Sequence, residues 1–176
     1  MHLPPGLAVV QRSEEEGRAY MDWHMRQAMS EPCFFSMQLL NAATPLVTQG
    51  KLAQEVVLRL RGQVVTHLNA AIRDPDRMLT IPVLLTVASI ALHERLFGEA
   101  RNALEIHGPA FSRMLALKGG IESLEVPRIG FALIKFTTDV LSSTNSGMST
   151  GDLLKRWAPS GLRKQHPGYG SAAEQA

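Results

Sequence analysis

The sequence predicts an all-α fold, a single-domain bundle of about six helices with a flexible C-terminal tail. Apolar residues recur at spacings of three and four, and alternating patterns are almost absent. Prolines and glycines punctuate the chain where such segments begin and end. A chain of 176 residues with 45% apolar and 19% charged residues suits one domain with a core of its own. We expect a flexible N-terminus at 1–12, a helical domain at 13–144, and a linker, short helix and disordered tail at 145–176.

The first two helices are predicted from their start signals. Ser13 opens a Ser-x-x-Glu capping box, in which the Ser hydroxyl and the Glu carboxylate each bond a backbone N–H of the first turn. A helix is therefore expected over Glu14–Met29. A second helix is expected to begin with Pro32 in its first turn, where no backbone donor is needed. It should run to about Ala43 and end before Pro45.

The third and fourth helices differ in their apolar pattern. Gly50 opens the third helix, and the Asp-Pro-Asp sequence at Asp74 stops it. Its apolar stripe is Val57, Leu60, Val64, Leu68 and Ala71. The fourth helix is predicted over Ile81–Phe97, with Thr80 as its N-cap. Because this segment is apolar nearly all round, it belongs in the middle of the bundle.

The fifth helix is predicted over Glu99–Lys118 and contains a Gly-Pro pair at Pro109. A proline removes one helical hydrogen bond and crowds the preceding turn, so we expect a kink or break near His107. The Gly-Gly pair at Gly119 ends this helix, with one glycine in the left-handed conformation. A sixth helix is expected over Pro127–Ser142.

Composition excludes several classes of function. The single cysteine, Cys33, rules out internal disulfides, redox Cys pairs and multi-thiolate metal sites, and it favours a reducing intracellular compartment. The apolar, uncharged run 78–92 is too short to span a membrane. The 18 basic and 16 acidic residues nearly balance and aromatic residues are scarce, so we expect no direct nucleic-acid binding. No histidine pair has metal-ligand spacing, and we expect no metal or cofactor.

Two blocks carry a family resemblance. The first is the buried helix from Pro82 to Gly98, and the second runs from Ala110 to Leu124. The second block contains an Arg-Met-x-x-Leu-Lys-Gly-Gly-Ile run formed by Arg113, Met114, Leu117, Lys118, Gly119, Gly120 and Ile121. Together they resemble the C-terminal regulatory (effector) region of fungal zinc-cluster transcription factors, over about Val56 to Leu141. That family's zinc cluster needs six thiolates, which this chain lacks.

The resemblance implies a non-enzymatic regulatory module that acts through protein contacts, with a small apolar ligand as a further possibility. It also implies a nuclear location; without it, the cytoplasm is the expectation. The ligand-binding candidates are His93, His107 and Arg113. The alternative hypothesis is a small helical enzyme or metabolite-binding protein with a pocket near the Gly108–Pro109 break. Its catalytic candidates are His93, His107 and Asp139, because buried polar groups in apolar helices need partners.

Other polar or soft residues have simpler interpretations. Cys33 follows Pro32 in an apolar helix start, which favours an inert buried thiol. His24 and His67 are expected at the surfaces of amphipathic helices. The side chains Met21, Met25 and Met29, spaced by four, form an apolar ridge that could dock a partner helix or a second copy of the chain.

Overall fold

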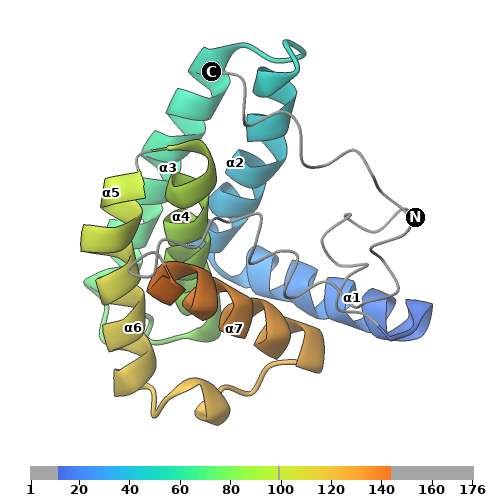
Figure 1. The fold of residues 1–176 in the computed structure, drawn as a ribbon, viewed down its shortest axis with the longest axis vertical. Helices are drawn as coiled ribbons and strands as arrows, with labels where there is room; N and C mark the ends of the chain where they lie inside the picture. Colours follow the sequence, from blue (N-terminus) through green and yellow to red (C-terminus); the bar gives the residue numbers. More distant parts are fainter. Residues whose placement is uncertain (1–11, 99, 144–176) are drawn as a thin grey trace.

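The computed structural model describes residues 12–98 and 100–143, and every regular element in this part of the chain is a helix (Figure 1). The all-α prediction is confirmed. The segment predicted at 145–176 and nearly all of the predicted N-terminal segment lie outside the described residues. The elements are α1 (Glu14–Ser30), α2 (Pro32–Thr48), α3 (Gln54–Ile72), α4 (Ile81–Phe97), α5 (Ala100–Asn102), a π-helical segment (Ala103–His107), α6 (Gly108–Leu117), a 3₁₀ turn (Ile121–Ser123) and α7 (Arg128–Ser143).

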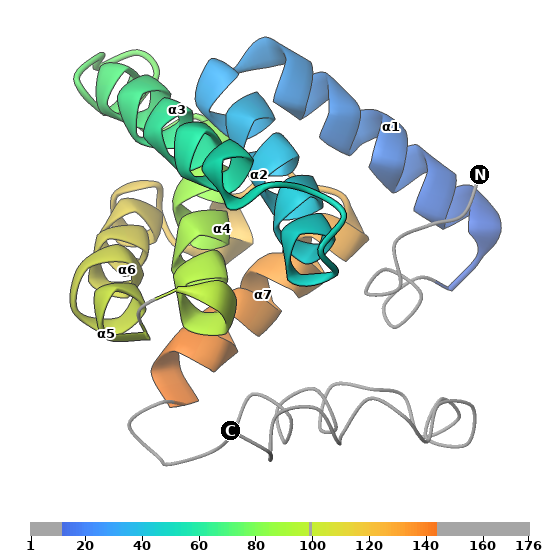
Figure 2. The same ribbon diagram turned by 90° about the horizontal axis from the view of Figure 1, so that it is seen from above.

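Helix α4 lies at the centre of the bundle, as its sequence predicts. It contacts α1, α2, α3, α5, α6 and α7. Figure 2 shows α4 with α3 above it, α5 and α6 on one side, and α7 below. The helix has no charged residue before Glu94, so nearly its whole length can be covered by neighbours without burying a charge.

Helices α1 and α2 begin where their start signals predict, but α2 does not end where the sequence predicts. The Ser13 hydroxyl accepts from the backbone N–H of Glu16 at 3.1 Å, as in a capping box. The Glu16 carboxylate, however, accepts from the backbone of Arg12 instead of Ser13. The predicted end before Pro45 is wrong, because α2 continues through this proline to Thr48. Pro45 is exposed, so water can bond the carbonyl that the proline leaves without a donor.

Two further boundary signals act differently from their predictions. Gly50 lies in the turn after α2 with φ +69°, a conformation that favours glycine, and α3 begins only at Gln54. Thr80 is the N-cap residue of α4, as predicted, but its hydroxyl donates to the carbonyl of Arg77 at 2.8 Å and makes no side-chain cap. The Thr80 side chain therefore closes the loop between α3 and α4, and the first turn of α4 is bonded to Thr80 through its backbone carbonyl alone.

The predicted irregularity near His107 is a π-helical turn. The backbone N–H of Gly108 donates to the carbonyl of Ala103, five residues earlier, so the helix widens without breaking. Pro109 then lies in the first turn of α6. Gly108 is buried, and a Cβ at this position would lie 2.9 Å from the Ala103 oxygen. The wide turn therefore requires glycine at 108.

The end of α6 and the start of α7 complete the bundle. Gly119 and Gly120 both have positive φ, 96° and 90°, whereas the sequence predicts one left-handed glycine. Helix α7 begins at Arg128, whose guanidinium donates two hydrogen bonds to Glu16 at the start of α1. This contact lowers the pKa of Glu16 to about 2. The N-terminus of α7 is thus joined to the N-terminus of α1, the first helix of the described chain.

Candidate functional site

An ion pair joins α3 to α4 next to the predicted site residue His93. The Glu94 side chain is only 8% exposed, and the Arg61 guanidinium donates to its carboxylate. A buried carboxylate is stable only with such a partner. Sequence reasoning does not single out Arg61, because nothing in its local pattern distinguishes it from an ordinary surface arginine.

His93 links α4 to α2 through a hydrogen bond between side chains. Its Nε2 lies 2.9 Å from the Thr44 hydroxyl, which itself donates to the carbonyl of Leu40 at 2.8 Å. Because that hydroxyl has one proton, the shared proton must come from His93 Nε2. Burial lowers the pKa of His93, the charge of Arg61 lowers it further, and Glu94 opposes both. His93 is therefore a neutral donor that fastens two helices.

His107 ends the π-helical segment and is half-buried. Burial lowers its pKa, while the charge of Glu94 raises it and that of Arg61 lowers it. The same ion pair thus acts on both His93 and His107. The two predicted histidines therefore share the influence of one charged pair, although they lie on different elements.

The other two predicted site residues lie elsewhere. Arg113 is exposed on α6. Asp139 lies on α7 and faces Lys135, one turn before it, with 4.0 Å between the charged atoms. Neither residue is among the groups that shift the pKa of His93 or His107. The charges that act on the histidines are those of Arg61 and Glu94.

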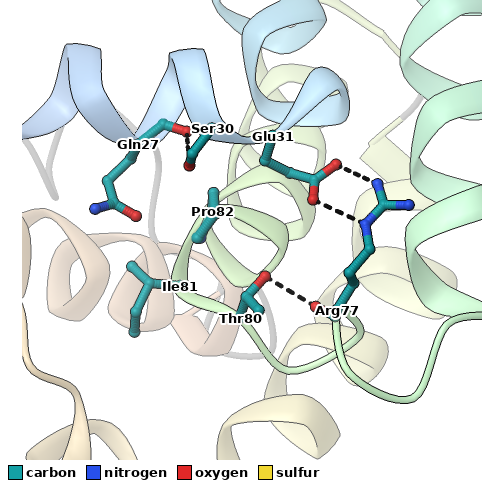
Figure 3. Close-up of a pocket in the computed structure, with 7 residues that line it drawn as sticks. All are labelled: Gln27, Ser30, Glu31, Arg77, Thr80, Ile81 and Pro82. Carbon is teal, nitrogen blue, oxygen red and sulfur yellow. Dashed lines mark hydrogen bonds and ion pairs between the residues drawn. The ribbon is translucent and has the colours of Figure 1, made fainter.

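A pocket of about 500 Å³ opens where the α1–α2 corner meets the start of α4 (Figure 3). Its lining residues are Gln27, Ser30, Glu31, Arg77, Thr80, Ile81 and Pro82. Glu31 is only 5% exposed, and the guanidinium of Arg77 donates to both carboxylate oxygens, at 2.6 and 3.2 Å. The pair forms one wall, and Ile81 and Pro82 form an apolar one. The pocket is a shallow hollow that is widely open to solvent.

Three histidines from three different helices contact α2. His24 of α1 packs its ring edge-on against Phe34, with 5.0 Å between ring centroids. His67 of α3 lies 2.9 Å from the Ser36 hydroxyl through Nδ1. His93 of α4 is the third. His24 and His67, expected at the surfaces of amphipathic helices, are half-buried, and each joins its helix to α2.

Cys33 is the inert thiol that the sequence predicts. Its side chain is fully buried and lies 3.4 Å from the Thr86 hydroxyl. Burial raises the pKa of the Cys33 thiol to about 11. At neutral pH the reactive thiolate is therefore scarce.

The outer side of α2 is apolar and uncovered. Phe35, Leu39 and Leu46 are 40%, 42% and 40% exposed, and Ala42 between them is also exposed. Their spacing of four, three and four puts them on one side of the helix. We call these four residues the α2 face. The predicted methionine ridge divides, because Met21 packs toward Tyr20 and Ile129 while Met25 and Met29 remain exposed.

Across residues 12–98 and 100–143, no group of three or more His, Cys, Asp or Glu side chains is placed to hold a metal ion. The helices of the same ranges are all too short or too polar to cross a bilayer. Comparisons with family models, curated proteins and solved structures found no match to this chain. No relative therefore assigns a role to any of these residues.

Proposed function

We propose that this chain is a non-enzymatic regulatory module that acts through protein contacts, in the manner of a fungal transcription-factor effector domain in the nucleus. The α2 face supports the proposal most directly. A helix of 17 residues presents Phe35, Leu39 and Leu46 to solvent and carries no charged side chain. Exposed apolar patches of this kind on folded proteins commonly mark contact surfaces.

The state of the candidate catalytic groups also favours a contact role. His93 donates its Nε2 proton to Thr44 and is only 5% exposed, so a substrate in solvent has no access to it. Glu94 is held by Arg61. These groups are engaged in joining α2, α3 and α4, which is the role of a scaffold.

A reporter experiment tests the proposal. The whole chain is fused to an unrelated DNA-binding domain in a fungal cell, and transcription from the matching promoter is measured. We expect the fusion to change reporter expression and Leu39→Ser to abolish the change. Leu117→Ser, which alters an exposed leucine on α6, is the matched control and should have no effect. A folded fusion that leaves the reporter unchanged would contradict the proposal.

The pocket beside Glu31 supports the finer suggestion of a small apolar ligand. Native mass spectrometry of the gently purified protein, followed by denaturing extraction, would reveal a bound molecule. Ile81→Trp, which fills the apolar wall, should release it. A native mass equal to that of the polypeptide alone would contradict the suggestion of a bound ligand.

The Arg61–Glu94 ion pair, whose charges act on both His93 and His107, supports a second candidate, a metabolite-binding protein or small enzyme. Its test is turnover of a candidate metabolite by the purified chain. Turnover that is lost in both His93→Gln and His107→Gln variants with unchanged folding would favour the enzyme over the contact module. Equal turnover in the variants and the parent chain would exclude these histidines from catalysis.

A further inference from the structure

The α2 face differs from many other exposed apolar positions because its helix contains no charged residue. On other helices, several exposed apolar residues stand beside a charged residue in the chain, as Met25 does beside Arg26, Leu58 beside Arg59, Ile72 beside Arg73 and Leu117 beside Lys118. From Pro32 to Thr48 no residue is charged. A partner for the α2 face therefore needs neither acidic nor basic groups to match it.

We infer that the partner of the α2 face is a second copy of this chain, bound through the same face about a two-fold axis. This inference rests on the proposed function, because it assigns a partner to the surface on which that function depends. In a two-fold contact each residue meets the same surface of the other copy, so a charged face repels itself. An uncharged apolar face pairs with itself without that penalty.

The spacing of the four residues fits such a pairing. Positions separated by four, three and four form the narrow seam through which two helices pack side by side. In an antiparallel arrangement Leu39 and Ala42 lie near the axis, and Phe35 of each copy lies toward Leu46 of the other. Ala42 is the smallest of the four, and its position near the axis allows the helices to approach closely.

The area of the face also bears on its partner. Specific interfaces bury about 800 Å² on each partner, which is a larger area than the side chains of one helical stripe provide. Met29, 71% exposed in the last turn of the adjoining helix α1 and six residues before Phe35, would add apolar surface to a contact that reaches the α1–α2 corner. Methionine side chains adapt to irregular partners and suit the rim of such a contact.

Sedimentation equilibrium of the full chain over a wide range of concentration tests the inference. The parent chain and the control Leu117→Lys should dimerise. Leu39→Lys and Leu39→Glu should each weaken the dimer more than about tenfold, because like charges meet near the axis. An equimolar mixture of the two variants should dimerise again, which a folding defect would not allow. Circular dichroism checks that each variant is helical.

Three results would overturn the inference: a monomeric parent chain at every concentration, a dimer that Leu39→Lys leaves intact, or no rescue in the mixture. The reporter experiment separates this failure from that of the proposed function. A monomeric chain whose reporter effect still requires Leu39 contacts a different protein through the same face. A dimer without a reporter effect keeps the partner but contradicts the regulatory role.

Discussion

Replacing Gly108 by alanine should destabilise the protein, although the same change in an ordinary helix stabilises it. In a helix interior alanine is favoured over glycine by about 1 kcal/mol. At Gly108 the added Cβ would lie 2.9 Å from the Ala103 carbonyl oxygen, closer than such atoms approach in proteins, and 3.8 Å from Leu141. Overpacking of a buried position costs about 1–3 kcal/mol. We therefore expect Gly108→Ala to lose about 1 kcal/mol of unfolding free energy.

Gly62 provides the matched control. It lies inside α3 and is exposed, and a Cβ added there would meet no atom within 4 Å. Gly62→Ala should therefore stabilise the protein by about 0.5–1 kcal/mol. The two variants carry the same chemical change and should differ in sign.

Urea unfolding followed by far-ultraviolet circular dichroism measures both changes. For a chain of this length, 1 kcal/mol corresponds to about 2–4 °C in Tm, so thermal scans should show the same order. If Gly108→Ala stabilised the protein as much as Gly62→Ala, the turn before α6 would have no π-helical hydrogen bond and no close approach to Ala103. The explanation of the Gly-Pro pair would then be wrong.

Three further predictions concern other buried groups. Arg77→Ala should lower the urea midpoint because Glu31 loses its partner, and adding Glu31→Gln should recover part of the loss; no recovery would argue against a buried charge. Because the folded-state pKa of His93 is lowered, the unfolded chain takes up its proton first, and stability should fall as pH drops below about 6.5. Unfolding measured against pH should be less steep in His93→Gln, and an unchanged slope would exclude this histidine as a cause. Cys33 should react with a thiol reagent only at the rate of unfolding; rapid labelling of the folded chain would contradict its burial.

Periodicity is sufficient to predict most of the fold because local pattern determines helices that bury one face. The bounds of α4 match the prediction at both ends, since proline and glycine punctuate it. Pro45 shows the limit of a local rule. Whether a proline ends a helix depends on whether the carbonyl that loses its hydrogen bond can bond water instead. The packing of α2 determines this access to water, and the local sequence does not.

The site is less predictable because its contacts join residues far apart in the chain. His93 can be identified as a polar residue in an apolar helix, but its partner Thr44 lies 49 residues earlier. Glu31 and Arg77 are separated by 46 residues. Which side chains meet depends on the crossing and register of three helices, which hydrophobic spacing alone does not specify. Arg113 and Asp139 have equally plausible sequence patterns and lie outside the ion-pair cluster.

Disulfide trapping at Leu39 tests the central role of the α2 face most directly. The chain has one cysteine, and it is buried, so Leu39→Cys introduces a single accessible thiol. If two α2 faces meet near Leu39, mild oxidation of dilute protein should produce a covalent dimer rapidly, while Leu117→Cys should remain mostly monomeric. Equal cross-linking of the two variants, or none at Leu39→Cys, would contradict self-association through α2.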